Sequence, residues 1–316
     1  MSAILVIMAT IVALVVVALL GAVISRRDMV SHVTKARIQK YVYFFAAPIA
    51  VIYALGNHDF SDNSRYLAFL IINAGSYAVL FFVTYVILKK KKISRKLAGV
   101  IAFSSNAPNT VFLGFPLVLA LFGQEAFVYV ALLGSLSDAF LNALRLFMLH
   151  KYKAPLLRRE KHSRAQLRSI IKETLTNPFL VALAIGGIIS YLHVPVPSGL
   201  RLIGLSASYA ALFALGLSVG HLKIKKADYG EIVVISTLKL FVLPLLILVP
   251  SYFLLGTDAR NVGVFVAALP SAVLSLIVAT NLKFDEDLAA SAILVTTVLS
   301  AVTLIGWYIV LKVILV

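Results

Sequence analysis

Long apolar runs separated by short polar connections dominate this chain of 316 residues. Runs of roughly 18 or more apolar residues are typical of transmembrane helices. The pattern predicts ten spans, at about 2–24, 36–56, 66–88, 97–122, 126–150, 177–193, 199–220, 229–255, 261–280 and 288–313. Because 61% of the residues are hydrophobic and only 13% are charged, the expected fold class is an all-α polytopic membrane protein.

Basic residues collect in alternate connections between these spans. Most of the 29 lysines and arginines lie in 25–40, 89–96, 151–172, 221–230 and 281–287. The intervening connections hold only Arg65 and Arg260. Since cytoplasmic connections carry such an excess, we expect both termini to lie outside the cytoplasm. The net charge of +16 then belongs to cytoplasmic flanks beside lipid headgroups, and we expect no nucleic-acid partner.

The long connection 151–176 divides the spans into two sets of five. An odd number per half means that the halves enter the membrane from opposite sides, which is the condition for an inverted repeat. We expect 1–150 to form the first five-helix repeat, 151–176 a basic cytoplasmic linker, and 177–316 the second repeat. Arg26 and Arg27 follow the first span rather than precede it, so this span is expected to be retained and not cleaved as a secretory signal.

Both fourth spans contain a proline near their middle: Pro116 in "FLGFPLVLAL" and Pro270 in "VAALPSAVLSL". A proline inside a helix removes a backbone donor and costs about 3 kcal/mol. Such breaks are tolerated in a membrane only where they face protein or a wet cavity. Two breaks at matching positions of inverted halves predict a binding site at the bilayer midplane, although a simple kink remains the alternative.

Polar residues precede Pro116, namely Asn106, Asn109 and Thr110, and Pro108, between the two asparagines, adds a second break to this span. An unwound segment exposes backbone N–H groups, and the half-helix that follows presents the positive end of its dipole. With the Asn109 amide, this arrangement would suit a carboxylate. The alternative is that Asn109 only joins two helices by a hydrogen bond.

These residues resemble the auxin efflux carrier family, which includes the plant PIN transporters and many prokaryotic members. The resemblance rests on "PNTVFLGFPLVLALFG" from Pro108, "TNPFLVALAIGGIIS" from Thr176, "LFALGLSVG" from Leu212, "LKLFVLPLL" from Leu238 and the long run from Ala267 that begins "AALPSAVLSL". These matches run through nearly the whole chain in the family's order. The missing hydrophilic central loop makes the chain similar to the prokaryotic type.

The resemblance implies ten helices in two inverted five-helix repeats, with broken, crossing fourth and ninth helices as in NhaA-like and bile-acid-symporter-like proteins. Spans 1, 2, 6 and 7 would form a scaffold, often dimeric, and spans 3–5 and 8–10 a mobile transport domain. An organic anion would bind where the broken helices cross. The implied substrate-binding residues are Asn109, Thr110, Pro116, Pro270, Ser271 and Asn177.

The chain departs from the plant members at two places near this site. Phe179 follows Asn177 and Pro178 where plant members have a second asparagine, and the third span offers only Asn73, Ser76 and Tyr77 where they have an Asp and a Lys. We therefore expect a small carboxylate or dicarboxylate rather than auxin itself.

Ionisable residues within the spans are few, and each is a functional hypothesis. Asp138 lies on the fifth span, on one helical face with Ser135, Asn142 and Arg145, and Lys239 lies about 15 Å into the eighth span. Asp138 and Lys239 are candidates either for an internal charge pair or for proton coupling. Arg145 is the weaker candidate, since its side chain could reach the cytoplasmic surface.

The function predicted by the sequence is a secondary transporter in the cell membrane that exports small organic anions by elevator-type alternating access. The alternatives are a cation- or proton-coupled carrier of the same architecture, or a membrane sensor that binds a ligand without moving it. The chain has no cysteine, and its histidines are not spaced as a metal pair, so we expect no enzyme activity, metal or cofactor. The expected partners are the organic anion, the lipid bilayer and a second copy of the chain.

Overall fold

The computed structural model describes residues 16–60, 63–153, 168, 171, 172, 174–219 and 229–315. Within these ranges every regular element is helical, and the β-type pairing consists of one isolated antiparallel bridge between Pro108 and Ser271. The side chains of Asp138, Asn142 and Arg145 lie outside the described part of the chain. The all-helical class expected from the sequence is confirmed.

The helices follow one another without strands between them. In chain order they are helix Val16–Arg26, α2 (His32–Tyr41), η1 (Val42–Ala46), α3 (Ala47–Gly56), α4 (Asn63–Lys90), α5 (Arg95–Ser104), η2 (Thr110–Gly114), α6 (Phe115–Lys153), α8 (Pro178–Tyr191), α9 (Gly199–Val219), α10 (Tyr229–Thr237), η4 (Leu238–Val242), α11 (Leu243–Leu254), α12 (Thr257–Ala267), α13 (Leu274–Leu282), α14 (Glu286–Ile309) and η5 (Val310–Ile314). The four η elements are π-helical turns, three of which continue an α-helix without a break.

Six described helices are long and apolar enough to cross a membrane, and two shorter apolar helices, Val16–Arg26 and Pro178–Tyr191, accompany them. The number differs from the ten expected spans for local reasons. The fourth and fifth runs join within α6, where Gly123 turns the chain with a φ of 88°, a conformation that glycine adopts without strain. The ninth run is divided into α12 and α13.

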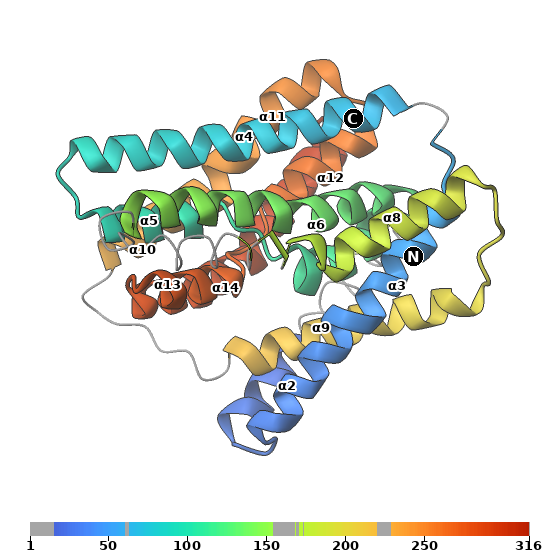
Figure 1. The fold of residues 1–316 in the computed structure, drawn as a ribbon, viewed down its shortest axis with the longest axis horizontal. Coiled ribbons are helices and arrows are strands. Elements are labelled where there is room, and N and C mark those ends of the chain that lie inside the picture. The colour runs from blue at the N-terminus through green and yellow to red at the C-terminus, as the bar shows by residue number, and fades with distance from the viewer. Residues whose placement is uncertain are drawn as a thin grey trace.

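The helices pack in two groups (Figure 1). Helices α2, α3, α8 and α9 contact one another on one side of the molecule. On the other side, α4 packs on α5 and α11, α12 packs on α11, and α14 packs on α10 and α13. Helix α6 contacts both groups, and the turn η2 packs on α9 and α6, so the fourth segment, 105–122, lies at the boundary between the groups.

Helix Val16–Arg26 is held unusually close to α9 by a pair of glycines. A Cβ atom on Gly216 would lie 1.9 Å from the carbonyl oxygen of Ala18, and one on Gly21 would lie 2.4 Å from that of Phe213. The Ser25 hydroxyl donates to the carbonyl of Leu217 at 2.9 Å. These contacts attach helix Val16–Arg26 firmly to the group that contains α9.

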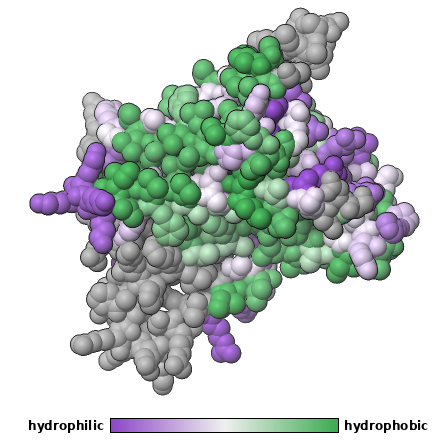
Figure 2. Space-filling view, turned by 90° about the horizontal axis from the view of Figure 1, so that it is seen from above, coloured by the Kyte–Doolittle hydropathy of each residue, from purple (hydrophilic) through white to green (hydrophobic). Residues whose placement is uncertain are grey.

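The molecular surface agrees with a membrane setting. Figure 2 shows hydrophobic residues across the middle of one face and hydrophilic residues gathered toward its two ends. The exposed large apolar side chains include Ile71 and Val79 on α4, Phe253 on α11 and Val302 on α14. A soluble protein rarely exposes so many contiguous apolar side chains, whereas lipid tails solvate them.

Candidate functional site

The two interrupted helices meet in the interior and pair through their backbones. After α5 ends at Ser104, residues 105–109 are not helical, and the chain turns into η2 at Thr110; α12 ends at Ala267, and α13 begins at Leu274. The Asn109 N–H donates to the carbonyl of Pro270 at 3.0 Å, and the Ala272 N–H donates to that of Ala107 at 2.8 Å. We call this contact between 107–109 and 270–272 the crossing.

Both prolines of the crossing fit this pairing. Pro108 and Pro270 lack an N–H, but the two hydrogen bonds use the N–H groups of Asn109 and Ala272. Backbone groups left free by the two breaks thus satisfy each other, which is what an apolar environment requires.

Ser271 fastens the crossing to its neighbours. It is fully buried; its hydroxyl donates to the carbonyl of Ser104 at 2.8 Å, and its N–H donates to the Thr296 hydroxyl on α14 at 3.1 Å. The Thr296 hydroxyl donates in turn to the carbonyl of Ala292. These bonds occupy the polar groups of Ser271, so its observed role is to hold the crossing together.

Asn109 and Thr110 carry polar atoms that the described residues leave unpaired. Both side chains are buried, and neither Asn109 Nδ2 nor Thr110 Oγ1 has a hydrogen-bond partner in the described part of the protein. The Asn109 carbonyl accepts from Leu113 and Gly114 at 3.1 and 3.0 Å, which forms the π turn η2. A buried amide without a partner is costly, so these two groups are available for a ligand beside the crossing.

The sequence indicated breaks at both Pro108 and Pro116, and the structure places the crossing at Pro108. Pro108, not Pro116, pairs with the 270–272 segment. Pro116 is the second residue of α6, and the π turn η2 runs directly into α6, so Pro116 lies inside a continuous helix rather than at the break. The "NAPNT" stretch carried the signal, because a proline disfavours helix at the residue before it.

Asn177 acts locally in the structure. Its side-chain oxygen accepts from the N–H of Phe179 at 2.8 Å and caps α8, and its amide donates to the Tyr43 hydroxyl at 3.3 Å. The Phe179 ring lies 5.9 Å from that of Phe115 at the start of α6. Asn177 therefore fixes the beginning of a helix that packs on the boundary segment.

Lys239 is a fully buried lysine next to the second break, and its contact there was missed by sequence reasoning. It lies in the π turn η4, and its Nζ donates to the carbonyl of Ala267 at 2.5 Å. Ala267 is the last residue of α12, where terminal carbonyls lack helical partners and a positive charge is favourable. Lys239 thus caps α12, the half-helix that leads into the crossing. A charge pair between Lys239 and Asp138 stays a prediction. A functional role of Arg145 also stays a prediction.

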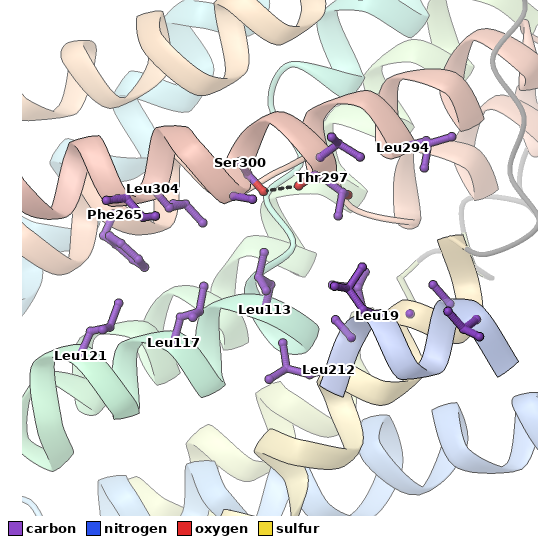
Figure 3. Close-up of a pocket in the computed structure, with 18 of the residues that line it drawn as sticks. Leu19, Leu113, Leu117, Leu121, Leu212, Phe265, Leu294, Thr297, Ser300 and Leu304 are labelled. Atoms are coloured by element: carbon purple, nitrogen blue, oxygen red, sulfur yellow. Dashed lines mark hydrogen bonds between the residues drawn. The ribbon is translucent and has the colours of Figure 1, made fainter. Parts of the chain in front are cut away.

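Two cavities flank the crossing. One, of about 130 Å³, is lined by Asn73, Tyr77, Asn106 and Pro108 together with apolar residues of α4 and α6. The other, of about 380 Å³, lies between helix Val16–Arg26, α6, α9 and α14 (Figure 3). Leu113 of η2 and Leu117 of α6 line its floor. Because Leu113 is four residues after Asn109, the cavity begins about one helical turn from Asn109.

A crossing of interrupted, apolar helices beside unpaired polar groups is the architecture of a membrane transporter, and the comparisons with known proteins agree. The chain belongs to the family described as membrane transport protein, whose profile matches residues 6–308. The resemblance to the auxin efflux carriers is confirmed.

Two of the similar proteins are transporters by name and match this chain over nearly their whole length. An uncharacterized transporter of Methanothermobacter thermautotrophicus is 22% identical over 306 residues, with 96% of this chain and 97% of that protein covered. The uncharacterized transporter YfdV of Escherichia coli is 24% identical over 305 residues, covering 93% and 94%. The lysosomal cholesterol signaling protein of mouse is 23% identical over 308 residues, which cover 90% of this chain but 35% of that larger protein.

Proposed function

We propose that the protein is a secondary transporter of organic anions that works by elevator-type alternating access. The observation that carries the proposal is the crossing, where the Asn109 amide and the Thr110 hydroxyl are buried without partners beside a backbone break. An amide N–H and a hydroxyl both donate to carboxylates, and the half-helix that starts at η2 adds the positive end of its dipole. A carboxylate placed there would gain donors that otherwise lie unpaired.

The packing of the helices supports movement of one group against the other. Helix Val16–Arg26, α2, α3, α8 and α9 would be the scaffold, and the crossing with α4, α5, η2, α6 and α10–α14 would be the transport domain. Because α6 and η2 lie at the boundary, a shift of the transport domain along the scaffold would carry the site with it. Lys239 would keep the two half-helices aligned during this movement.

The proposal includes the arrangement expected from the sequence. The ten spans would form two inverted five-helix repeats, 1–150 and 177–316, joined by the basic linker 151–176. The scaffold would mediate a homodimer in the cell membrane, with both termini outside the cytoplasm. The distribution of basic residues and the two interrupted helices support this arrangement.

Flux through proteoliposomes tests the proposal. Purified protein would be reconstituted in vesicles loaded with radiolabelled organic acids of increasing size and hydrophobicity, and efflux would be followed with and without a proton or sodium gradient. We expect efflux of at least one acid, and loss of that efflux in Asn109→Ala. Gradient dependence would favour the cation- or proton-coupled carrier, with Asp138 as the coupling group.

A membrane sensor is the second candidate, favoured by the name of the mouse relative, a signaling protein. A sensor would bind a ligand at the crossing but would not empty loaded vesicles. Saturable binding without any efflux, under every gradient, would therefore replace the transporter proposal with the sensor.

A further inference from the structure

The larger cavity differs in chemistry from a site for a small polar anion. Sixteen of the residues around it are apolar or glycine, and the remaining three are Arg26, Thr297 and Ser300. The Thr297 hydroxyl donates to the carbonyl of Ile293 at 2.6 Å, and the Ser300 hydroxyl donates to that of Thr297 at 2.7 Å (Figure 3). Both hydroxyl protons are therefore engaged by backbone, and the apolar walls offer a dicarboxylate nothing in exchange for its hydration.

The cavity is bounded by two different bodies. One wall is helix Val16–Arg26 with α9, which the Gly21 and Gly216 contacts join closely. The other walls come from the boundary helix α6 and from α14, which is tied to the crossing through Thr296 and Ser271. Figure 3 shows leucines of all these walls pointing into the space between them.

The cavity opens sideways through the lipid-facing perimeter. Six of its lining residues are also exposed on the molecular surface: Leu19 and Val23 on helix Val16–Arg26 and Val298 and Ile305 on α14, by 41% to 64%, together with Ala301 and Arg26. All of them except Arg26 are apolar, so in a membrane most of this opening faces acyl chains rather than water. A ligand that enters here must itself dissolve in the bilayer.

We propose that this cavity is a binding site for a single-chain carboxylate of the fatty-acid type, which enters from the bilayer between helix Val16–Arg26 and α14. Its chain lies among the leucines of α6, α9 and α14. Its carboxylate lies beside Arg26, the one cationic side chain among the described residues that line the cavity. A volume of about 380 Å³ is within the range of small-molecule sites. The proposal concerns binding alone and stands whether or not the molecule is carried across the membrane.

The single tryptophan of the chain provides the measurement. Trp307 lies on α14, one turn beyond the cavity residue Leu304, and its indole N–H donates to the carbonyl of Leu240 at 2.8 Å, which holds the ring in place. Protein in nanodiscs of uncharged phosphatidylcholine would be titrated with brominated stearic acid, whose bromines quench nearby tryptophan emission. We expect saturable quenching that unbrominated stearic acid reverses and succinate does not.

Neighbouring residues on the same helices supply matched controls. Ala301→Phe fills the cavity and should weaken binding about tenfold, because roughly two buried methylenes are displaced at about fourfold each, whereas Val302→Phe, on the exposed lipid-facing side of α14, should change nothing. Arg26→Gln should weaken the binding of stearic acid about fivefold, whereas Arg27→Gln should leave this binding unchanged. Both arginine variants should bind brominated stearyl alcohol with the same affinity as the unchanged protein.

Three results would overturn the proposal. Quenching that never saturates would mean that the acid only dissolves in the lipid around Trp307. Equal affinities of Ala301→Phe and Val302→Phe would place the bound chain elsewhere. If Arg26→Gln lowered the affinity for the acid and for the alcohol equally, Arg26 would stabilise the helix rather than bind the carboxylate.

Discussion

At the scale of single residues, the most informative side chains are those whose polar groups are buried at the crossing. Asn109 Nδ2 and Thr110 Oγ1 have no hydrogen-bond partner among the described residues, whereas the Ser271 hydroxyl and Lys239 Nζ donate to backbone carbonyls. The first pair is available to a ligand, and the second pair holds the two breaks in place. Substitutions should separate these two kinds of residue by their effects on binding and on stability.

Replacing Asn109 with Ala should weaken binding of the transported anion by about 1–3 kcal/mol, the usual effect of removing one partner of a buried polar group. Stability should hardly change, since the Asn109 side-chain amide has no partner among the described residues. Thermal unfolding in detergent and equilibrium binding of the acid identified by flux would check both parts. An unaltered affinity with a lower melting temperature would show that Asn109 is structural.

Replacing Lys239 with Met should lower the melting temperature, because the buried carbonyl of Ala267 at the end of α12 loses its hydrogen-bond donor. We expect a cost of about 1–3 kcal/mol. Lys312→Met is the control, since the Lys312 ammonium only lies over the Phe122 ring at 5.3 Å. Equal melting temperatures for the two variants would contradict the capping role.

His58, in the connection between α3 and α4, should make stability depend on pH. Partial burial lowers the pKa of His58 below 6.5, and the Arg65 guanidinium lowers it further, against the opposing charges of Asp59 and Glu125. The folded state then binds fewer protons than the unfolded state, so the stabilisation is complete above pH 6.5 and is lost as the pH falls through the lowered pKa. A series of melting curves in detergent should show this decline, and His58→Gln should flatten it.

At the scale of elements, the sequence predicts helices well and their interruptions less well. Apolar runs mark the helices because every backbone group in a bilayer must be paired within the segment. The position of a break depends on the distant backbone segment that pairs with it, and the pattern of apolar residues does not identify that segment. Pro108 and Pro116 were both plausible breaks, and only the pairing with 270–272 distinguishes them. Lys239 was missed as a cap for the same reason, since its acceptor is a backbone carbonyl 28 residues away.

The contact of helix Val16–Arg26 with α9 offers a test at this scale. Gly216→Ala places a Cβ atom 1.9 Å from the Ala18 carbonyl oxygen, so the two helices must separate, at a cost of about 1–3 kcal/mol. Gly187→Ala on α8 meets nothing within 4 Å and should be neutral or stabilising, because alanine favours helix. Melting temperatures of both variants would be compared, and equal values would argue against the close packing.

At the scale of the whole molecule, orientation in the membrane is the property on which the inverted repeat depends. Reporters fused after Val316 and within 57–65 should be accessible from outside, and reporters within 89–96 and 151–172 from the cytoplasm. An accessible cytoplasmic C-terminus would leave an even number of spans in one half. The inverted repeat, and with it the proposed alternating access, would then be wrong.

The crossing also governs how the chain can be assembled in the cell. Ser104 and Ser271, which it joins, are 167 residues apart in sequence, so the first break enters the membrane long before its partner has been synthesised. Until then the Ala107 carbonyl and the Asn109 N–H have no access to the bonds that they make in the finished protein. Ribosome-bound chains that end before residue 270 should therefore hold this segment against water, the insertion machinery or a chaperone rather than against lipid. Insertion of the second half, and not of the first, should release it.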